Sequence, residues 1–317
     1  MSATFRGLTA LAAAGSLAAA SLLAQEHQHA AAPEKLGTVH FETSCQTAAQ
    51  PQFDRAMALL HSFEFGAAID GFTSTLSADP GCAMAYWGIA LARWGNPFAA
   101  VNRQPPQLQQ GLDAITQARR IGARTERERG YIDAAAKLYV DFNTVDQRTR
   151  VVGYCQAMEK LAAAYPNDRE ASIFYALSLT ASALPTDKTY ANQLKAGAIL
   201  EGLYREQPDH PGIAHYIIHS YDVPALADHA LDAARKYAAI APSAPHALHM
   251  PSHTFTRVGA WQESIDTNIL SAEAAHRENA TAEELHAMDY LTYAYLQTGQ
   301  DNAVRALMQT LPGIAGR

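Results

Sequence analysis

From about Phe53 onward, apolar residues recur at the three- to four-residue spacing of amphipathic helices, and short segments containing proline or glycine interrupt the pattern. No stretch sustains the two-residue alternation of a half-buried strand. The pattern therefore predicts an all-α fold in which turns join consecutive helices. Residues 25–48 lack helical spacing, and we expect them to form an extended N-terminal arm ahead of a helical region over 49–317.

The prolines in these interruptions indicate an internal repeat. Pro80, Pro166, Pro208 and Pro242 each fall where one predicted helix ends and the next begins. The last two are 34 residues apart, since 242 − 208 = 34. A repeat of this length is typical of a unit made of two helices and a turn.

Further residues give this repeat a family resemblance. Ala68 before Pro80 and Ala230 before Pro242 are small residues near the start of a second helix, and RVGAWQES (257–264) has the character of an inter-helix turn. In these respects the chain resembles the tetratricopeptide repeat (TPR) family. The resemblance implies a tetratricopeptide-like helical-hairpin solenoid whose first helices line a concave, ligand-binding face.

Four segments are more particularly similar to a group of exported bacterial tetratricopeptide proteins with no assigned activity. They are FDRAMALLHSFEFGAAIDGF (53–72), DPGCAMAYWGIALA (79–92), HYIIHSYD (215–222) and APHALHMPSHTFTRVGAWQESI (244–265). The resemblance therefore implies an architecture and leaves the chemistry open.

Two histidine pairs stand one repeat apart in these segments. His215 and His219 recur as His249 and His253, since 249 − 215 = 34. The i,i+4 spacing places both imidazoles of a pair on one helix face, and the repeat offset places the second pair on the equivalent helix of the next unit. We therefore expect the four imidazoles to converge.

Other polar residues extend these faces. His246 and Asp222 lie one turn from the two pairs, and a third equivalent helix over 283–298 carries His286, Asp289 and Tyr293. Neutral imidazoles are the commonest metal ligands, and several of them suit Zn, Cu, Ni or Fe. The sequence predicts one divalent-metal site, supported by the four neighbouring side chains. Its residues are His215, His219, His249, His253, Asp222, His246, His286 and Asp289.

Two other interpretations of the histidines stay open. They can line a groove that binds a peptide, a protein or a small ligand, or they can pack without any ligand and hydrogen-bond to neighbours such as Tyr216 and Tyr221. Pro251 lies between His249 and His253, so the helix there either starts later or bends.

The chain lacks the motifs of common hydrolases and nucleotide-binding enzymes. His215 to His219 has no glutamate in the position that zinc proteases require, and neither Gly-x-Ser-x-Gly nor a phosphate-binding Gly-x-x-x-x-Gly-Lys occurs. A metal-dependent enzyme using the same His/Asp cluster is therefore the alternative to a binding protein.

The net charge of the chain bears on its partners, and its N-terminal residues bear on its cellular location. A net charge of −7 gives no electrostatic reason to expect nucleic acid as a partner. Residues 1–24 have the order of an export signal, with Arg6, an apolar run from Leu8 to Leu23, and Ala24 at the cleavage position. We expect a periplasmic or secreted protein with no stable membrane span after cleavage.

Three cysteines complete the set of reactive side chains. In an oxidising compartment Cys45 and Cys82 can form a disulfide while Cys155 stays free. The alternative is three buried thiols.

Overall fold

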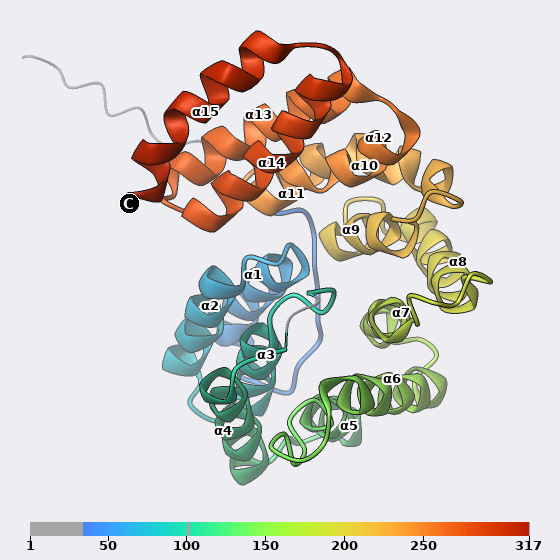
Figure 1. Ribbon diagram of the computed structural model, residues 1–317. Coiled ribbons are helices and arrows are strands. Elements are labelled where there is room, and N and C mark those ends of the chain that lie inside the picture. Colours follow the sequence, from blue (N-terminus) through green and yellow to red (C-terminus); the bar gives the residue numbers. More distant parts are fainter. Residues whose placement is uncertain (1–33, 100–101, 317) are drawn as a thin grey trace, which may run out of the picture. The chain divides into compact units, whose positions relative to one another are not determined.

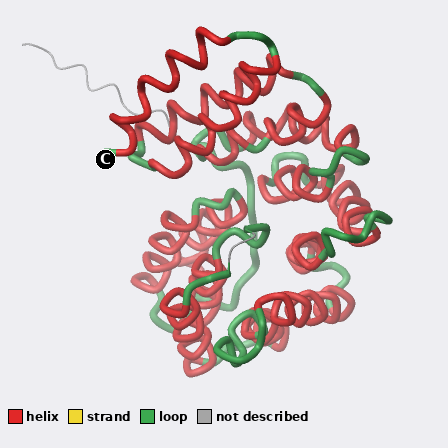
Figure 2. The backbone as a smooth tube through the Cα atoms, viewed as in Figure 1, coloured by secondary structure: helices red, strands yellow, loops and turns green. Residues whose placement is uncertain are grey.

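The computed structural model describes residues 34–99 and 102–316. The predicted signal segment 1–24 and the first part of the predicted arm lie outside the described residues. The described part is all-α and contains no strand (Figures 1 and 2). This confirms the predicted fold class. None of the described helices is long and apolar enough to cross a membrane.

The helices follow one another through the described chain, with short loops between most of them (Figure 2). Two short 3-10 helices, η1 (Thr47–Ala49) and η2 (Ala227–Ala230), accompany them. The α-helices are α1 (Gln50–His61), α2 (Phe65–Ala78), α3 (Ala83–Trp94), α4 (Pro105–Ile121), α5 (Glu126–Ala136), α6 (Gln147–Ala164), α7 (Arg169–Ser182), α8 (Ala191–Glu206), α9 (Pro211–Ser220), α10 (Leu231–Ile240), α11 (Pro245–His249), α12 (Pro251–Val258), α13 (Trp261–Arg277), α14 (Thr281–Gln297) and α15 (Asp301–Ala315).

Neighbouring helices pack as consecutive hairpins, as the repeat pattern predicts. α1 packs on α2, α6 on α7, α8 on α9, and α13 on α14 (Figure 1). The prolines Pro80, Pro166, Pro208 and Pro242 all lie in turns between helices. A proline has no N–H to donate and cannot continue a preceding helix, so it ends one helix before the next begins.

One contact joins helices that are far apart in the sequence. α1 packs against α9, and α7 also packs against α9. Gly212 allows this approach, because a Cβ atom there would lie only 2.4 Å from Nδ1 of His61 in α1. The contact brings the end of α1 to the helix that carries His215 and His219.

The segment before α1 runs without helix or strand from residue 34 to residue 43. Leu36, Val39 and Phe41 of this segment are buried in the main hydrophobic core. A disulfide joins Cys45 to Cys82 at the N-terminus of α3, and Cys155 is free and buried. The predicted pairing is therefore confirmed in the structure.

Candidate metal centre

Six histidines of α9, α11, α12 and α14 gather in two sets of three. One imidazole nitrogen from each member of a set lies within 4.8 Å of the others. We call His215, His219 and His246 the inner group, because His215 and His246 are buried and His219 is partly buried. We call His249, His253 and His286 the outer group, because His286 is exposed.

Hydrogen bonds at Nδ1 orient two of the three rings of the inner group, those of His215 and His246. Nδ1 of His215 donates to the backbone carbonyl of His61 over 2.6 Å, and Nδ1 of His246 lies 3.3 Å from Oε2 of Glu283. The carbonyl is one of those that the end of α1 leaves without a helical partner. Because carbonyl and carboxylate oxygens only accept, Nδ1 carries the proton in both rings and Nε2 carries a lone pair.

The Nε2 atoms of all three inner histidines are buried and have no hydrogen-bond partner. Buried polar atoms are nearly always paired, so three unpaired atoms in one cluster require an explanation. Metal-bound histidines show this arrangement: one ring nitrogen donates to an oxygen and the other faces the ion. Three nitrogens around a tetrahedral ion stand about 3.4 Å apart, and one nitrogen of each inner ring already lies within 4.8 Å of the others.

Aromatic rings enclose the inner group. The ring of Phe63 lies 4.4 Å from that of His215 and 5.6 Å from that of His219, and Phe98 stacks on His219 at 4.1 Å. Burial, followed by the proximity of other imidazoles, lowers the pKa of His215 and His219 well below the usual value. The two rings are therefore neutral at pH 7, which is the form that binds metals.

Phe63 reaches this place through an uncommon backbone conformation. Its φ angle is +59°, in the left-handed region that bulky residues rarely adopt. Such a residue costs of the order of 1–3 kcal/mol and persists only where its surroundings hold it. The cost is offset here by ring packing against both inner-group helices.

A carboxylate also borders the inner group. Oε1 of Glu64 accepts the backbone N–H of His246 over 3.2 Å. Burial raises the pKa of Glu64 to about 7. At neutral pH this carboxyl therefore exists in both charged and uncharged forms.

The outer group has its own supporting partners. Nδ1 of His253 lies 2.9 Å from Oδ2 of Asp222, whose other oxygen accepts from Arg257, and Nδ1 of His249 lies 2.7 Å from Oδ1 of Asn268. Burial raises the pKa of Asp222, but the hydrogen bonds from His253 and Arg257 outweigh it and keep the pKa below its usual range. Asp222 is therefore an anion that orients a histidine.

These positions change the sequence prediction in two respects. The four histidines of the two pairs do not make one set, because His246 completes the first pair and His286 completes the second. Asp289 is exposed and belongs to neither group, and Tyr293 packs on Trp261 instead.

The face of α14 that meets the histidines is the one with Glu283, His286 and Tyr290. Oε2 of Glu283 lies 3.3 Å from His246, and the hydroxyl of Tyr290 lies 3.3 Å from Nδ1 of His253. Tyr290 follows His286 by four residues and Asp289 follows it by three, so helix spacing alone places both residues on the same face as His286. No sequence pattern predicts that Asn268 or the His61 carbonyl contacts these histidines, because each lies on a different helix that tertiary packing brings to the site.

The helix is interrupted just before Pro251, and the interruption does not separate the second pair. α11 ends at His249 and α12 begins at Pro251, and Met250 between them keeps helical angles. Nε2 of His249 and Nε2 of His253 are 3.1 Å apart.

A third cluster, His61 with Glu170 and His210, has a different character. Both imidazoles lie within 3.0 Å of the Glu170 carboxylate, and their other nitrogens are hydrogen-bonded to Tyr216 and to the backbone N–H of Ile213. Burial raises the pKa of Glu170, but the two imidazoles outweigh this and hold the pKa far below its usual range. Each ring nitrogen is thus satisfied, and we assign this cluster a structural role.

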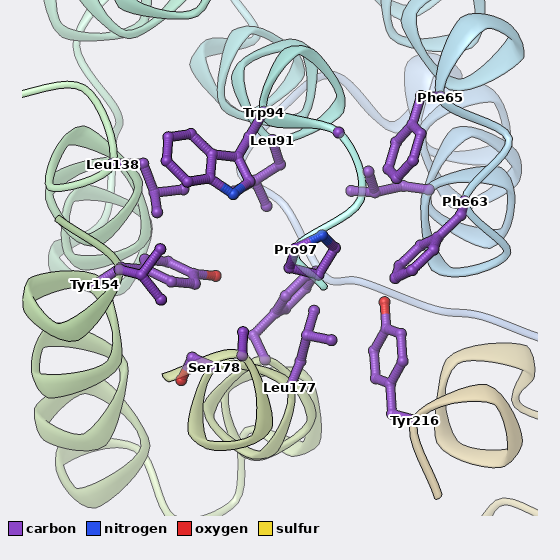
Figure 3. Close-up of a pocket in the computed structure, with 15 residues that line it drawn as sticks. Phe63, Phe65, Leu91, Trp94, Pro97, Leu138, Tyr154, Leu177, Ser178 and Tyr216 are labelled. Carbon is purple, nitrogen blue, oxygen red and sulfur yellow. The ribbon is translucent and has the colours of Figure 1, made fainter. Parts of the chain in front are cut away.

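A small apolar cavity adjoins the inner group, with Phe63 and Tyr216 on one side and Leu138 and Tyr154 on the other (Figure 3). Its volume is about 40 Å³, room for only a few water molecules. Phe63 thus separates the inner histidines from an apolar interior.

Comparisons with known proteins give this chain neither a family nor a function. No family model matches the chain, and no curated protein matches it. Among solved structures, one that is similar is described as "Crystal structure of YrrB: a TPR protein with an unusual peptide-binding site". It is 17% identical, with a TM-score of 0.31, and the alignment covers 63% of this chain and 90% of that one.

Proposed function

We propose that the protein binds a divalent transition-metal ion through Nε2 of His215, His219 and His246. The observation that carries the proposal is that the Nε2 atoms of all three histidines are buried and have no hydrogen-bond partner. In His215 and His246, the other ring nitrogen, Nδ1, donates to an oxygen atom and so fixes the orientation of the ring. Three imidazoles suit Zn, Cu, Ni or Fe. The end of α1 adds the partial negative charge of its carbonyls, which favours a cation.

Three protein ligands leave a fourth position for water or another molecule. Catalytic zinc sites have this composition, whereas structural sites use four protein ligands. The alternative of a metal-dependent enzyme is therefore decided by whether a bound ion keeps an exchangeable water. The peptide-binding site named for YrrB belongs to that protein, and a TM-score of 0.31 gives no argument for one here.

His219→Phe is the substitution that tests the proposal. The side chain stacks on both Phe63 and Phe98, so phenylalanine keeps an aromatic ring there and removes both ring nitrogens. We expect metal affinity at the inner group to fall by more than about 100-fold, because loss of a supporting partner alone costs 10- to 100-fold. Isothermal titration of untagged, chelator-treated protein with Zn²⁺, Cu²⁺ and Ni²⁺ measures this.

His229→Ala is the matched control, since it removes an exposed histidine outside both groups. It should bind metal as the wild type does. A metal that saturates the inner group at about 100 times its dissociation constant should raise the free energy of unfolding by about 2.7 kcal/mol. A wild type that binds none of the three ions, or a His219→Phe protein with unchanged affinity, would show that these histidines only pack or contact another ligand.

A further inference from the structure

The outer group contains a conflict that hydrogen bonding alone does not resolve. The amide of Asn268 donates to the backbone carbonyl of Ser264, so its Oδ1 is the atom that accepts from Nδ1 of His249. The carboxylate of Asp222 likewise accepts from Nδ1 of His253. Both rings therefore carry their proton on Nδ1, and both Nε2 atoms carry lone pairs.

These two lone pairs face each other across 3.1 Å. Neither atom can donate, so the contact is repulsive unless a proton or a metal cation lies between them. Two nitrogens bound to one tetrahedral ion lie about 3.4 Å apart, close to the observed separation.

The two groups are also neighbours. Ring centroids are 6.0 Å apart between His219 and His253, and 6.1 Å apart between His246 and His249. An ion about 2 Å from Nε2 lies about 3 Å from the ring centroid, so ions in the two groups would stand no more than about 12 Å apart.

We infer that the outer group binds a second transition-metal ion and that the two groups together form one dinuclear centre. The inference rests on the proposed function of the inner group. The carboxylates of Asp222 and Glu283 flank the two groups and offset part of the added charge.

The two positions differ in access. His215 and His246 are buried, whereas His286 is exposed and Tyr290 is partly buried. The inner ion is therefore enclosed, and the outer ion exchanges with solvent more rapidly and keeps water in its open positions. A ligand or substrate would reach the centre from the side of α14.

Titration with Cu²⁺ monitored by low-temperature electron paramagnetic resonance tests the inference. With two equivalents bound, the wild type should show lines broadened by dipolar coupling between the ions. His219→Phe should bind only the outer ion, and the double variant His253→Ala/His286→Ala only the inner one. Each variant should give the narrow spectrum of an isolated copper site with nitrogen hyperfine structure.

Three results would overturn the dinuclear centre. The wild type could bind a single Cu²⁺, or its spectrum at two equivalents could equal the sum of the two variant spectra. In both cases the inner site would still stand if the double variant bound copper. If the double variant binds none while His219→Phe binds one, the proposed function of the inner group fails and only the outer group is a metal site.

Discussion

At the scale of single residues, the hydrogen bond at one ring nitrogen determines what the other nitrogen can do. In the inner and outer groups, Nδ1 of four histidines meets an oxygen acceptor and Nε2 stays available. In the cluster of His61, Glu170 and His210 both nitrogens of each ring are occupied. Similar residue types thus form candidate ligands in one place and a structural network in another.

Asp222 tests this reasoning at the outer group. Its hydrogen bonds go to His253 and Arg257. In a His219→Phe background, which isolates the outer site, Asp222→Ala should lower Cu²⁺ affinity 10- to 100-fold, because His253 loses the partner that fixes its orientation. Isothermal titration gives the two affinities. Asp228→Ala, an exposed acid in η2, is the control, and equal losses in both variants would contradict a positioning role.

The sequence predicted the two histidine pairs correctly, but it did not predict that they belong to two separate groups or which partners orient them. The i,i+4 spacing placed His215 with His219 and His249 with His253, and both pairs converge. On α14 the sequence analysis predicted a face with His286, Asp289 and Tyr293, whereas the face that meets the histidines carries Tyr290, four residues after His286. The packing of α14 places Tyr290 against the histidines and leaves Asp289 exposed.

At the scale of helices, the site depends on how closely α9 approaches α1. Nothing larger than a hydrogen fits at Gly212 without moving the ring of His61, which is fully buried. The same approach lets the His61 carbonyl accept from His215. Helix propensity alone would favour alanine at this position.

Gly212→Ala should therefore destabilise the protein by about 1–3 kcal/mol, the usual cost of overpacking, and weaken metal binding at the inner group. Gly202→Ala is a matched control in the middle of α8, where an added Cβ would meet nothing within 4 Å. It should instead stabilise by about 0.5–1 kcal/mol. Urea denaturation of both variants measures the difference, and effects of the same sign would refute the close-approach argument.

At the scale of the whole described chain, the disulfide and the long-range packing hold separate helices together. The bridge between Cys45 and Cys82 closes a loop over a sequence separation of 37 and joins the segment before α1 to α3. The helical repeat was predictable because its period is local in sequence. The meeting of α1 with α9 was not, because no local pattern encodes which distant helix a given face contacts.

Reduction of the disulfide should lower the free energy of unfolding by up to about 4 kcal/mol, since the cross-link restricts the unfolded chain. Guanidinium denaturation with and without reductant measures this, and thiol counting should rise from one to three. The double variant Cys45→Ala/Cys82→Ala should not respond to reductant. An unchanged midpoint in the fully reduced wild type would show that packing alone holds this end.

The contact between His61 and His215 spans 154 residues of sequence, and this separation orders the events of folding. Contacts between such distant residues form late, because a long loop must close before they contribute any free energy. The hairpin of α1 and α2 can assemble while His246 is still unsynthesised, since its helices are adjacent in the chain. Any ion in the inner group is therefore acquired by a nearly finished molecule, and it cannot nucleate the folding of the first repeats.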